Sequence, residues 1–302
     1  GESGCGKSVT AQAIVQLLPD NGQISSGSIV FSPNNQDVEL NKLEKFGKQM
    51  RDIRGAKIGM IFQDTLSSLN PAHKVGRQVA ESLLQHFDIS KDEARTRVIE
   101  LFRKLGIPDP ERRYEAYPHE FSGGMRQRVM IAIATVCEPD LVIADEPTTA
   151  LDVTIQAQIM TLLKELQKTA GKTFILITHN MALVSEVADH VAVMYLGRVV
   201  EYGAVDEVLR DPRHPYTQAL MASVPTLDAD KDVELQTVDG QTPSPAEVTV
   251  GCEFAGRCPY VINACKEKTV EMRQISSSHE VRCIRLDANG KLPVLVGGAK
   301  SE

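Results

Sequence analysis

Apolar residues follow two patterns along this chain: short continuous runs, and longer stretches with apolar positions three or four residues apart. Short β-prone runs occupy four segments, residues 28–31, 57–62, 140–144 and 173–178. The last three are expected to be buried strands, because polar or turn residues bound them. Helical patterns lie between these runs, at residues 125–137 and 153–168. Alternating strands and helices predict an α/β fold with a largely parallel sheet.

A separate helical pattern fills residues 75–117. Ser90 and Glu93 form a predicted capping box in this stretch, ahead of apolar residues at helical spacing. We therefore expect an all-helical subdomain at about residues 64–124. Further along, Gly197 separates two short apolar runs, which predicts a hairpin.

A change of composition near residue 225 predicts a domain boundary. Beyond it Asp, Thr, Pro and Ser dominate, and dense apolar periodicity disappears until a cysteine-containing segment. The sequence therefore predicts an α/β domain over residues 1–225 and a small C-terminal region over residues 226–302.

Composition and charge restrict the partners. The chain has 302 residues, of which 42% are hydrophobic, enough for a substantial core in one or two domains. The formal net charge of −7 argues against the broad basic surface of a nucleic-acid binder, so no nucleic acid is expected as a partner. Because no run of about 18 apolar residues occurs, a role at a membrane would require docking rather than spanning.

The first eight residues, GESGCGKS, satisfy the phosphate-loop pattern. The candidate nucleotide-binding residues are Gly1, Glu2, Ser3, Gly4, Cys5, Gly6, Lys7 and Ser8. Glycines let backbone amides approach phosphate oxygens, Lys7 neutralises phosphate charge, and Ser8 offers a hydroxyl to Mg²⁺. An ordinary glycine-rich turn is the alternative, but the full pattern seldom arises by chance. Because this motif normally follows a strand, we expect an N-terminal segment to be missing from the sequence.

Two carboxylates close the third apolar run. Asp145 and Glu146 would lie at the carboxyl end of a parallel strand, where α/β folds bind ligands. One can hold Mg²⁺ while the other polarises water. For the pair taken alone, two solvated acids are an equally good interpretation.

Two further polar residues close neighbouring runs. Gln63 follows residues 57–62 and His179 follows residues 173–178, so both are expected at the same sheet edge. Each would be within reach of a γ-phosphate or its attacking water. Taken singly, each is more simply a satisfied turn residue.

The segments FSGGMRQR (121–128) and LVIADEP (141–147), followed by Ala150, Leu151 and Asp152, resemble the ABC ATPase family. The order of phosphate loop, glutamine, signature, acidic strand and histidine covers residues 1 to about 200. The resemblance implies an ABC-type P-loop ATPase domain of the α/β class, with ATP and Mg²⁺ as cofactors.

The signature residues Ser122, Gly123 and Gly124 are expected just before a helix that begins near Met125. A hydroxyl and backbone amides at a helix N-terminus form an anion site, and a structural cap is the compatible alternative. In the family, the signature of one subunit faces the ATP held by another. Because one phosphate loop and one signature occur here, we expect a homodimer or a heterodimer with a similar ATPase chain.

The resemblance also implies a role for each remaining site residue. Glu146 would be the general base for water, and His179 would contact the γ-phosphate. Asp145, Ser8 and Gln63 would bind Mg²⁺, and Lys7 would bind the phosphates. Gln63 would also link the nucleotide to the membrane partner, and Asp152 would communicate across the dimer.

Residues 60–71 (MIFQDTLSSLNP) and 213–225 (RHPYTQALMASVP) resemble the dipeptide and oligopeptide importer branch more closely, a branch that includes nickel importers. This implies an ATPase that drives two separate membrane permease subunits, supplied by an external substrate-binding protein. The chain would be peripheral, at the cytoplasmic face of the inner membrane, with the helical subdomain against the permease. His214, Pro215 and Tyr216 are interpreted as a turn and a packing helix, not as a site.

Three alternatives remain for the function. The first is a nickel importer ATPase of the same branch. The second is a soluble ABC ATPase acting on DNA or ribosomes, which the compact stretch between Gln63 and Ser122 disfavours. The third is a non-enzymatic interaction or redox-sensing protein, against which Glu146 and His179 argue.

Four of the six cysteines, Cys252, Cys258, Cys265 and Cys283, lie in the last fifth of the chain, with five, six and seventeen residues between neighbours. These spacings differ from the short pairs of zinc ribbons. Four thiolates can hold an iron–sulfur cluster, and the pattern with Phe254, Arg257 and Pro259 is similar to cluster-bearing members of the peptide importer branch, which implies a [4Fe–4S] cluster. Unliganded thiols are the alternative, and disulfides are disfavoured where ATP is available.

Overall fold

The structure is a computed structural model that describes residues 1–2, 4–64, 68–149, 151–224, 240–244, 247–248 and 250–294. The chain divides into two compact units. One unit combines Gly1–Lys7 with His179–Glu302, and the other is Ser8–Thr178. The predicted boundary at residues 225 and 226 lies outside the described residues.

A parallel sheet forms the centre of the unit Ser8–Thr178. Its strands are β3 (Ile58–Ile61), β4 (Leu141–Asp145) and β5 (Thr173–Ile177), in the order β3-β4-β5. All five residues of β4 are buried, as expected for a parallel strand covered on both faces. The three strands predicted from the apolar runs are therefore confirmed, but β5 is not buried as predicted, because Thr173 and Ile175 are exposed.

Helices α1 (Lys7–Ile14) and α7 (Gly123–Thr135) pack against this sheet. Ala11 of α1 belongs to the same buried apolar cluster as Ile143 of β4 and Ile177 of β5. On the β3 side, a Cβ atom at Gly59 would lie 2.0 Å from the carbonyl oxygen of Ala134. Only glycine therefore permits the observed approach of α7 to β3.

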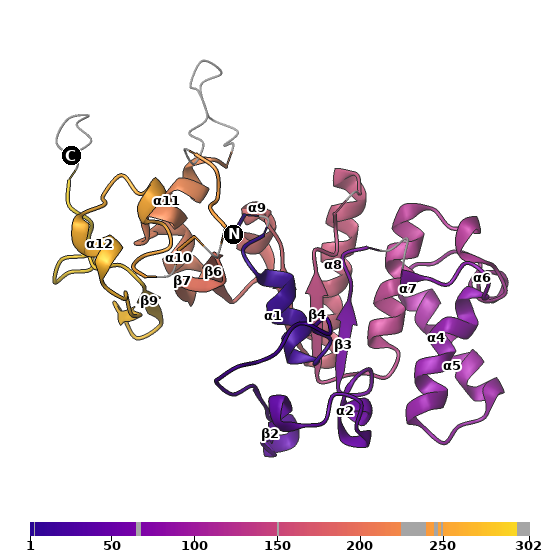
Figure 1. Ribbon diagram of the computed structural model, residues 1–302. Coiled ribbons are helices and arrows are strands. Elements are labelled where there is room, and N and C mark those ends of the chain that lie inside the picture. Colours follow the sequence, from indigo (N-terminus) through magenta and orange to yellow (C-terminus); the bar gives the residue numbers. More distant parts are fainter. Residues whose placement is uncertain are drawn as a thin grey trace. The chain divides into compact units, whose positions relative to one another are not determined.

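A group of helices precedes α7. These helices are α4 (Val75–His86), α5 (Lys91–Lys104) and α6 (Pro110–Tyr114), and Figure 1 shows them packed together. Buried Val79, Leu83, Val98 and Phe102 join α4 to α5. The Ser90 hydroxyl accepts a hydrogen bond from the Glu93 backbone N–H at 3.1 Å, which confirms Ser90 as the cap of α5.

The rest of this unit consists of short elements and one long helix. β1 (Val30–Phe31) and β2 (Val38–Glu39) form an antiparallel pair, α2 (Lys48–Ile53) follows, and α8 (Val153–Ala170) connects β4 to β5. The apolar run at residues 28–31 thus yields only a two-residue strand.

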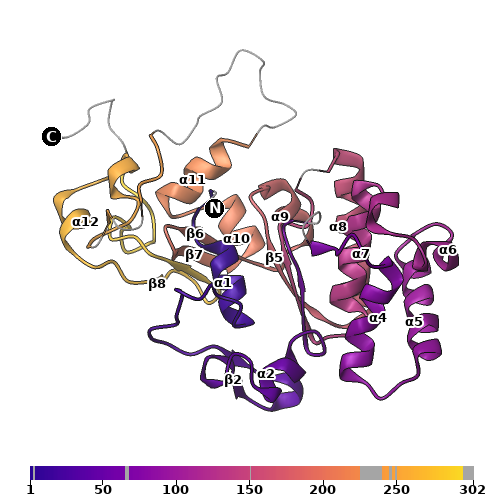
Figure 2. The same ribbon diagram turned by 45° about the vertical axis from the view of Figure 1, so that its right-hand side comes forward.

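An antiparallel sheet dominates the other unit. Its strands are β6 (His190–Tyr195), β7 (Arg198–Ala204), β8 (Arg273–Gln274) and β9 (His279–Val281), in the order β6-β7-β9-β8. Figure 2 labels β6, β7 and β8 of this sheet. Leu196 and Gly197 connect β6 to β7 with φ angles of 44° and 77°, the conformation of a tight hairpin turn. The predicted hairpin is confirmed, and the C-terminal strands β8 and β9 extend its sheet.

Short helices and an aromatic cluster complete this unit. The helices are α9 (Met181–Val187), α10 (Val205–Arg210), α11 (Pro215–Ala222) and α12 (Asn263–Glu267), with the 3-10 turn η4 (Ala255–Arg257). Tyr195, Tyr216 and Phe254 are fully buried, and their ring centroids lie 4.6 to 5.4 Å apart. Among the helices of the described residues, none has the length and apolar character needed to cross a bilayer.

Candidate functional site

Two of the residues predicted to bind Mg²⁺, Ser8 and Asp145, are hydrogen-bonded to each other. The Ser8 hydroxyl, in the first turn of α1, donates a hydrogen bond of 3.0 Å to Asp145 Oδ1 at the carboxyl end of β4. Asp145 is only 4% exposed. A hydroxyl and a carboxylate are hard oxygen ligands of the kind Mg²⁺ takes together with phosphate oxygens and water. The two side chains therefore suit the predicted ion.

Glu146, the predicted general base, is held by two donors. Gln63 Nε2 donates to Glu146 Oε2 at 3.0 Å, and Thr149 Oγ1 donates to the same oxygen at 2.8 Å. Gln63 reaches this position because β3 and β4 are parallel neighbours that end at the same sheet edge. The structure thus brings Gln63 and Glu146 together. Thr149 was not among the predicted site residues, and only its place three residues after Glu146 could have indicated it.

In the phosphate loop, Lys7 is hydrogen-bonded to carbonyl oxygens of the loop itself. Lys7 Nζ donates to the carbonyl oxygens of Gly1 and Glu2, both at 2.8 Å. Gly4 and Gly6 have φ angles of 81° and 89°, which favour glycine. The ammonium group therefore already contacts oxygen atoms inside the loop, and phosphate oxygens could take their place. Ser3 lies outside the described residues.

Cys5 anchors the loop in the antiparallel unit. Its side chain is fully buried in the core that contains Tyr195 and Tyr216, and its carbonyl accepts from Gly197 N–H at 2.9 Å. The Tyr216 hydroxyl also accepts the Glu2 backbone N–H, at 2.8 Å. Tyr216 was interpreted as a packing residue, and the structure adds this contact with the phosphate loop.

The signature residues form a helix N-terminus, but not as predicted. α7 begins at Gly123, two residues earlier than expected, so Gly123 and Gly124 lie inside its first turn. The Ser122 hydroxyl caps the helix by accepting from Met125 N–H at 3.4 Å. First-turn amides of a helix have no partner within it, so the glycines still present N–H groups suited to an anion. Asp152 caps α8 in the same way, accepting from Ile155 N–H at 3.0 Å.

His179 lies two residues beyond the end of β5, just before α9. It belongs to the unit that contains Lys7, whereas Gln63, Asp145 and Glu146 belong to the other. Its contact with the γ-phosphate stays a prediction.

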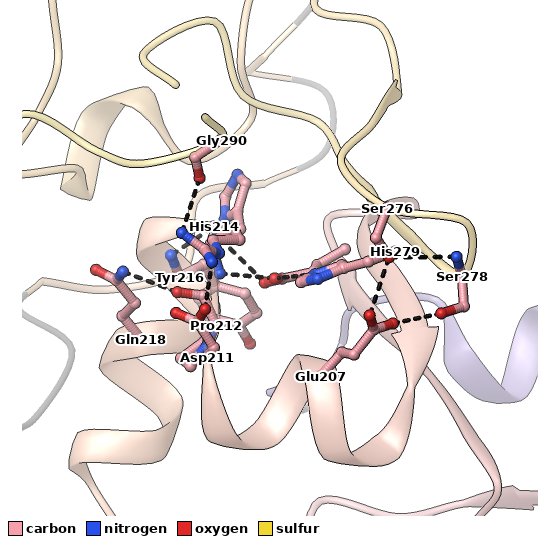
Figure 3. Close-up of polar contacts among 12 residues, drawn as sticks. Glu207, Asp211, Pro212, His214, Tyr216, Gln218, Ser276, Ser278, His279 and Gly290 are labelled. Atoms are coloured by element: carbon pink, nitrogen blue, oxygen red, sulfur yellow. Dashed lines mark hydrogen bonds and ion pairs between the residues drawn. The ribbon is translucent and has the colours of Figure 1, made fainter. Parts of the chain in front are cut away.

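His214, the first residue of the segment His214–Pro215–Tyr216 (the HPY segment), lies in a buried polar network (Figure 3). Glu201 of β7, which is fully buried, accepts from the backbone N–H of Arg213 at 2.7 Å and of His214 at 3.0 Å, and it contacts His279 Nε2 at 2.8 Å. His214 Nδ1 accepts from Tyr216 N–H at 3.1 Å and so caps α11. Burial, with a smaller effect of Arg282, lowers the pKa of His214 to about 3, so the imidazole is neutral.

The four C-terminal cysteines line one small cavity, together with His214 and Phe254. All six cysteines of the chain are free thiols. Burial raises the pKa of Cys252 to about 11 and that of Cys258 to about 12. The backbone two residues further on, at Phe254 and Tyr260, opposes this rise.

The predicted cluster is not established by this arrangement. Within the described part of the chain, no three His, Cys, Asp or Glu side chains are grouped so as to hold a metal ion. Cys5 and Cys137 are both buried elsewhere, and burial raises the pKa of Cys137 to about 11. Cys137 is therefore a core residue.

Two family models match the chain. The model for ABC transporter matches residues 1–149, and the model for oligopeptide/dipeptide transporter, C-terminal region, matches residues 200–265. The dipeptide transport ATP-binding protein DppD of Bacillus subtilis is 49% identical over 301 residues, which are 99% of this chain and 88% of that protein. The oligopeptide transport ATP-binding protein OppD of the same organism is 50% identical over 93% of this chain and 77% of its own length.

Solved structures show the same fold. A dimeric ATP-binding cassette, MJ0796, in a post-hydrolysis state with ADP and Pi has a TM-score of 0.59 and 29% identity, over 68% of this chain and 83% of that one. The cbiO1 protein of Clostridium perfringens, part of the ABC transporter complex cbiONQ, has a TM-score of 0.57 and 34% identity, over 70% and 77%.

The chain is therefore an ABC-type ATPase cassette. It belongs to the ABC transporter family and carries the C-terminal region of the oligopeptide/dipeptide transporters. The family, the fold class and the ATPase activity predicted from the sequence are confirmed.

Proposed function

We propose that the chain hydrolyses ATP to energise the import of di- and oligopeptides through a separate membrane permease. The observation that carries this proposal is the similarity over 99% of the chain to a dipeptide transport ATP-binding protein. The C-terminal region typical of oligopeptide/dipeptide transporters supports it. The names of these relatives refer to peptides, so the nickel alternative is not favoured.

Within this function, Glu146 takes the proton of the attacking water. Gln63 and Thr149 orient its carboxylate through the two hydrogen bonds to Oε2. Lys7 exchanges the carbonyl oxygens of Gly1 and Glu2 for phosphate oxygens, and His179 contacts the γ-phosphate. Ser8, Asp145 and Gln63 would hold Mg²⁺, which neutralises phosphate charge when bound.

The site is completed by a second ATPase chain. Ser122 and the first-turn amides of Gly123 and Gly124 would face the ATP held by the phosphate loop of that chain, and Asp152 would communicate between the two. The dimer would dock on two permease subunits at the cytoplasmic face of the membrane, fed by an external substrate-binding protein. The relation to a dimeric cassette supports this assembly.

We further propose that Cys252, Cys258, Cys265 and Cys283 hold a [4Fe–4S] cluster. The support is that the four thiols line one cavity, because four thiolates can hold such a cluster. Bound iron would supply the positive charge that buried thiolates need.

The transport proposal is tested by uptake of labelled di- and oligopeptides, and of nickel, in cells that express the full-length protein. Glu146→Gln should abolish peptide uptake at matched expression, since the amide cannot accept the proton of water. Glu44→Gln is the control, because Glu44 is an exposed carboxylate in the stretch before α2. Loss of nickel uptake alone would indicate a metal importer, and unchanged uptake of both would contradict the import proposal.

The cluster proposal is tested by iron and sulfide analysis and by electron paramagnetic resonance of the reduced protein, purified without oxygen. We expect about four iron atoms per chain, and Cys265→Ser should remove the signal. Cys137→Ser is the control, because Cys137 is also a buried thiol but does not line the cavity. Equal iron content in both variants, or none in the parent protein, would rule the cluster out.

A further inference from the structure

A partly buried ion pair joins the phosphate loop to residues 252–283, the segment that carries the four C-terminal cysteines and is called the cysteine segment below. Arg257 Nη1 donates to Glu2 Oε2 at 2.8 Å, and Nη2 donates to Oε1 at 3.2 Å. The Arg257 side chain is 7% exposed and that of Glu2 29%. A two-point contact of this kind fixes both the position and the orientation of the carboxylate.

Arg257 is itself held from several directions. Its Nη1 also donates to the hydroxyls of Tyr195 and Thr242, each at 3.3 Å, and its guanidinium lies 5.9 Å from the centre of the Tyr195 ring. The Thr242 hydroxyl donates to Glu2 Oε2 at 2.9 Å. The carboxylate of Glu2 is thus surrounded by donors that are supplied by sequence-distant segments of the same unit.

Arg257 is adjacent in the chain to one of the four C-terminal cysteines. Arg257 is the last residue of η4 and immediately precedes Cys258. Glu2 has a second contact with α11, because the Tyr216 hydroxyl accepts a hydrogen bond from the Glu2 backbone N–H. Tyr216 and Arg257 both lie in residues 200–265, which the C-terminal family model matches, and both therefore contact the same residue of the phosphate loop.

A carboxylate inside a phosphate loop poses an electrostatic problem. ATP is a polyanion, and Glu2 adds a negative charge to the loop in which glycine amides and Lys7 are expected to bind it. Repulsion between like charges is strong where protein displaces water. A fixed cation that captures this carboxylate removes the repulsion and keeps the side chain away from the loop interior.

We propose that Arg257 is a positioning residue for ATP binding: it captures and neutralises the Glu2 carboxylate, and through it the cysteine segment sets the affinity of the phosphate loop for nucleotide. The inference rests on the phosphate-loop role proposed for residues 1–8. Any change in the cysteine segment that displaces Arg257 then weakens ATP binding.

The test is equilibrium binding of ATP to the full-length protein. Arg257→Met keeps much of the side-chain length for packing on Tyr195 but removes the charge, and it should raise the Kd for ATP about tenfold. Adding Glu2→Gln in the same chain should bring the Kd back to within about threefold of the parent protein, because a neutral amide does not repel phosphate. The Kd of Glu2→Gln alone is measured as the reference for this double variant.

Arg198→Ala is the matched control. Arg198 pairs with Glu253, which also lies in the cysteine segment, but at 57% side-chain exposure and without contact to Glu2. Its loss should leave the Kd for ATP unchanged. Thermal unfolding of each variant shows whether the protein remains folded.

Three outcomes would overturn the inference: an unchanged Kd in Arg257→Met, an equal loss in Arg198→Ala, or a loss that Glu2→Gln does not rescue. The last result would mean that Arg257 acts through packing alone. Lys7→Ala separates this inference from the proposal on which it rests. If Lys7→Ala leaves ATP binding intact, the phosphate-loop role itself is wrong; if it abolishes binding while Arg257→Met has no effect, only the inference fails.

Discussion

Glu146 has a backbone conformation that few residues other than glycine adopt. Its φ angle is 46°, and its N–H donates to the Ile177 carbonyl of the neighbouring strand at 2.9 Å. Left-handed conformations of this kind are strained and occur often at functional sites. Here the conformation directs the Glu146 side chain to the donors on Gln63 and Thr149. Backbone and side-chain contacts together fix the carboxylate that the proposed mechanism uses as base.

At this scale the clearest prediction concerns Thr149. Thr149→Val removes one of the two hydrogen bonds to Glu146 Oε2 and leaves the size of the side chain nearly unchanged. We expect kcat for ATP hydrolysis to fall about tenfold, or about 1.4 kcal/mol in barrier height, with little change in KM because the base does not bind ATP. Steady-state ATPase kinetics measure this.

Thr161→Val is the control for that experiment. The Thr161 hydroxyl donates only to the Ala157 carbonyl of its own helix, at 3.0 Å. Its loss should leave kcat unchanged. If Thr149→Val raised KM with kcat intact, Thr149 would bind nucleotide rather than orient Glu146.

Among the elements, those that could be predicted have a strong local signal. β3 and β4 come from continuous apolar runs because each is a largely buried parallel strand. β5 has a similar apolar run, although Thr173 and Ile175 are exposed. Parallel neighbours end at one edge, so Gln63 and Glu146 could be expected to meet. α7 begins at Gly123, two residues before the start expected from the sequence, although glycine is a poor helix former. The cap on Ser122 and the packing of Gly124 against Ile155 outweigh that propensity.

Other elements and contacts have no local signal. β8 and β9 lie in residues 273–281, RQISSSHEV, which contain no continuous apolar run. They form strands because β7 offers an edge with which β9 pairs. The pair of Glu2 and Arg257 joins residues 255 positions apart in the chain. No spacing or periodicity reports such a contact, and it becomes visible only when the sheet places η4 beside the phosphate loop within one unit.

At the scale of the whole chain, the C-terminal segment is not a separate appendage to residues 190–224. β9 pairs with β7 through residues 279–281, and Phe254 packs on Tyr195 and Tyr216 in the same buried cluster. The phosphate loop contributes Cys5 to that cluster. The antiparallel unit therefore draws its core from three stretches that are far apart in the sequence, which is a reason to expect them to fold together.

Glu201 offers a test of that integration, because it lies on β7 and contacts both the HPY segment and β9. Glu201→Gln replaces a buried carboxylate that accepts from Arg213, His214 and His279 with an amide that has a single acceptor oxygen. Buried donors left without partners cost about 1–3 kcal/mol each. We expect the melting temperature of the full-length protein to fall by about 5 °C, and trypsin to cleave the C-terminal segment faster.

Glu280→Gln is the control, because Glu280 is the adjacent, half-buried residue of β9; it should change neither the melting temperature nor the rate of cleavage. If cleavage accelerated while the melting temperature stayed the same, the C-terminal segment would open independently, and its hold on the phosphate loop would be weaker than the buried network indicates.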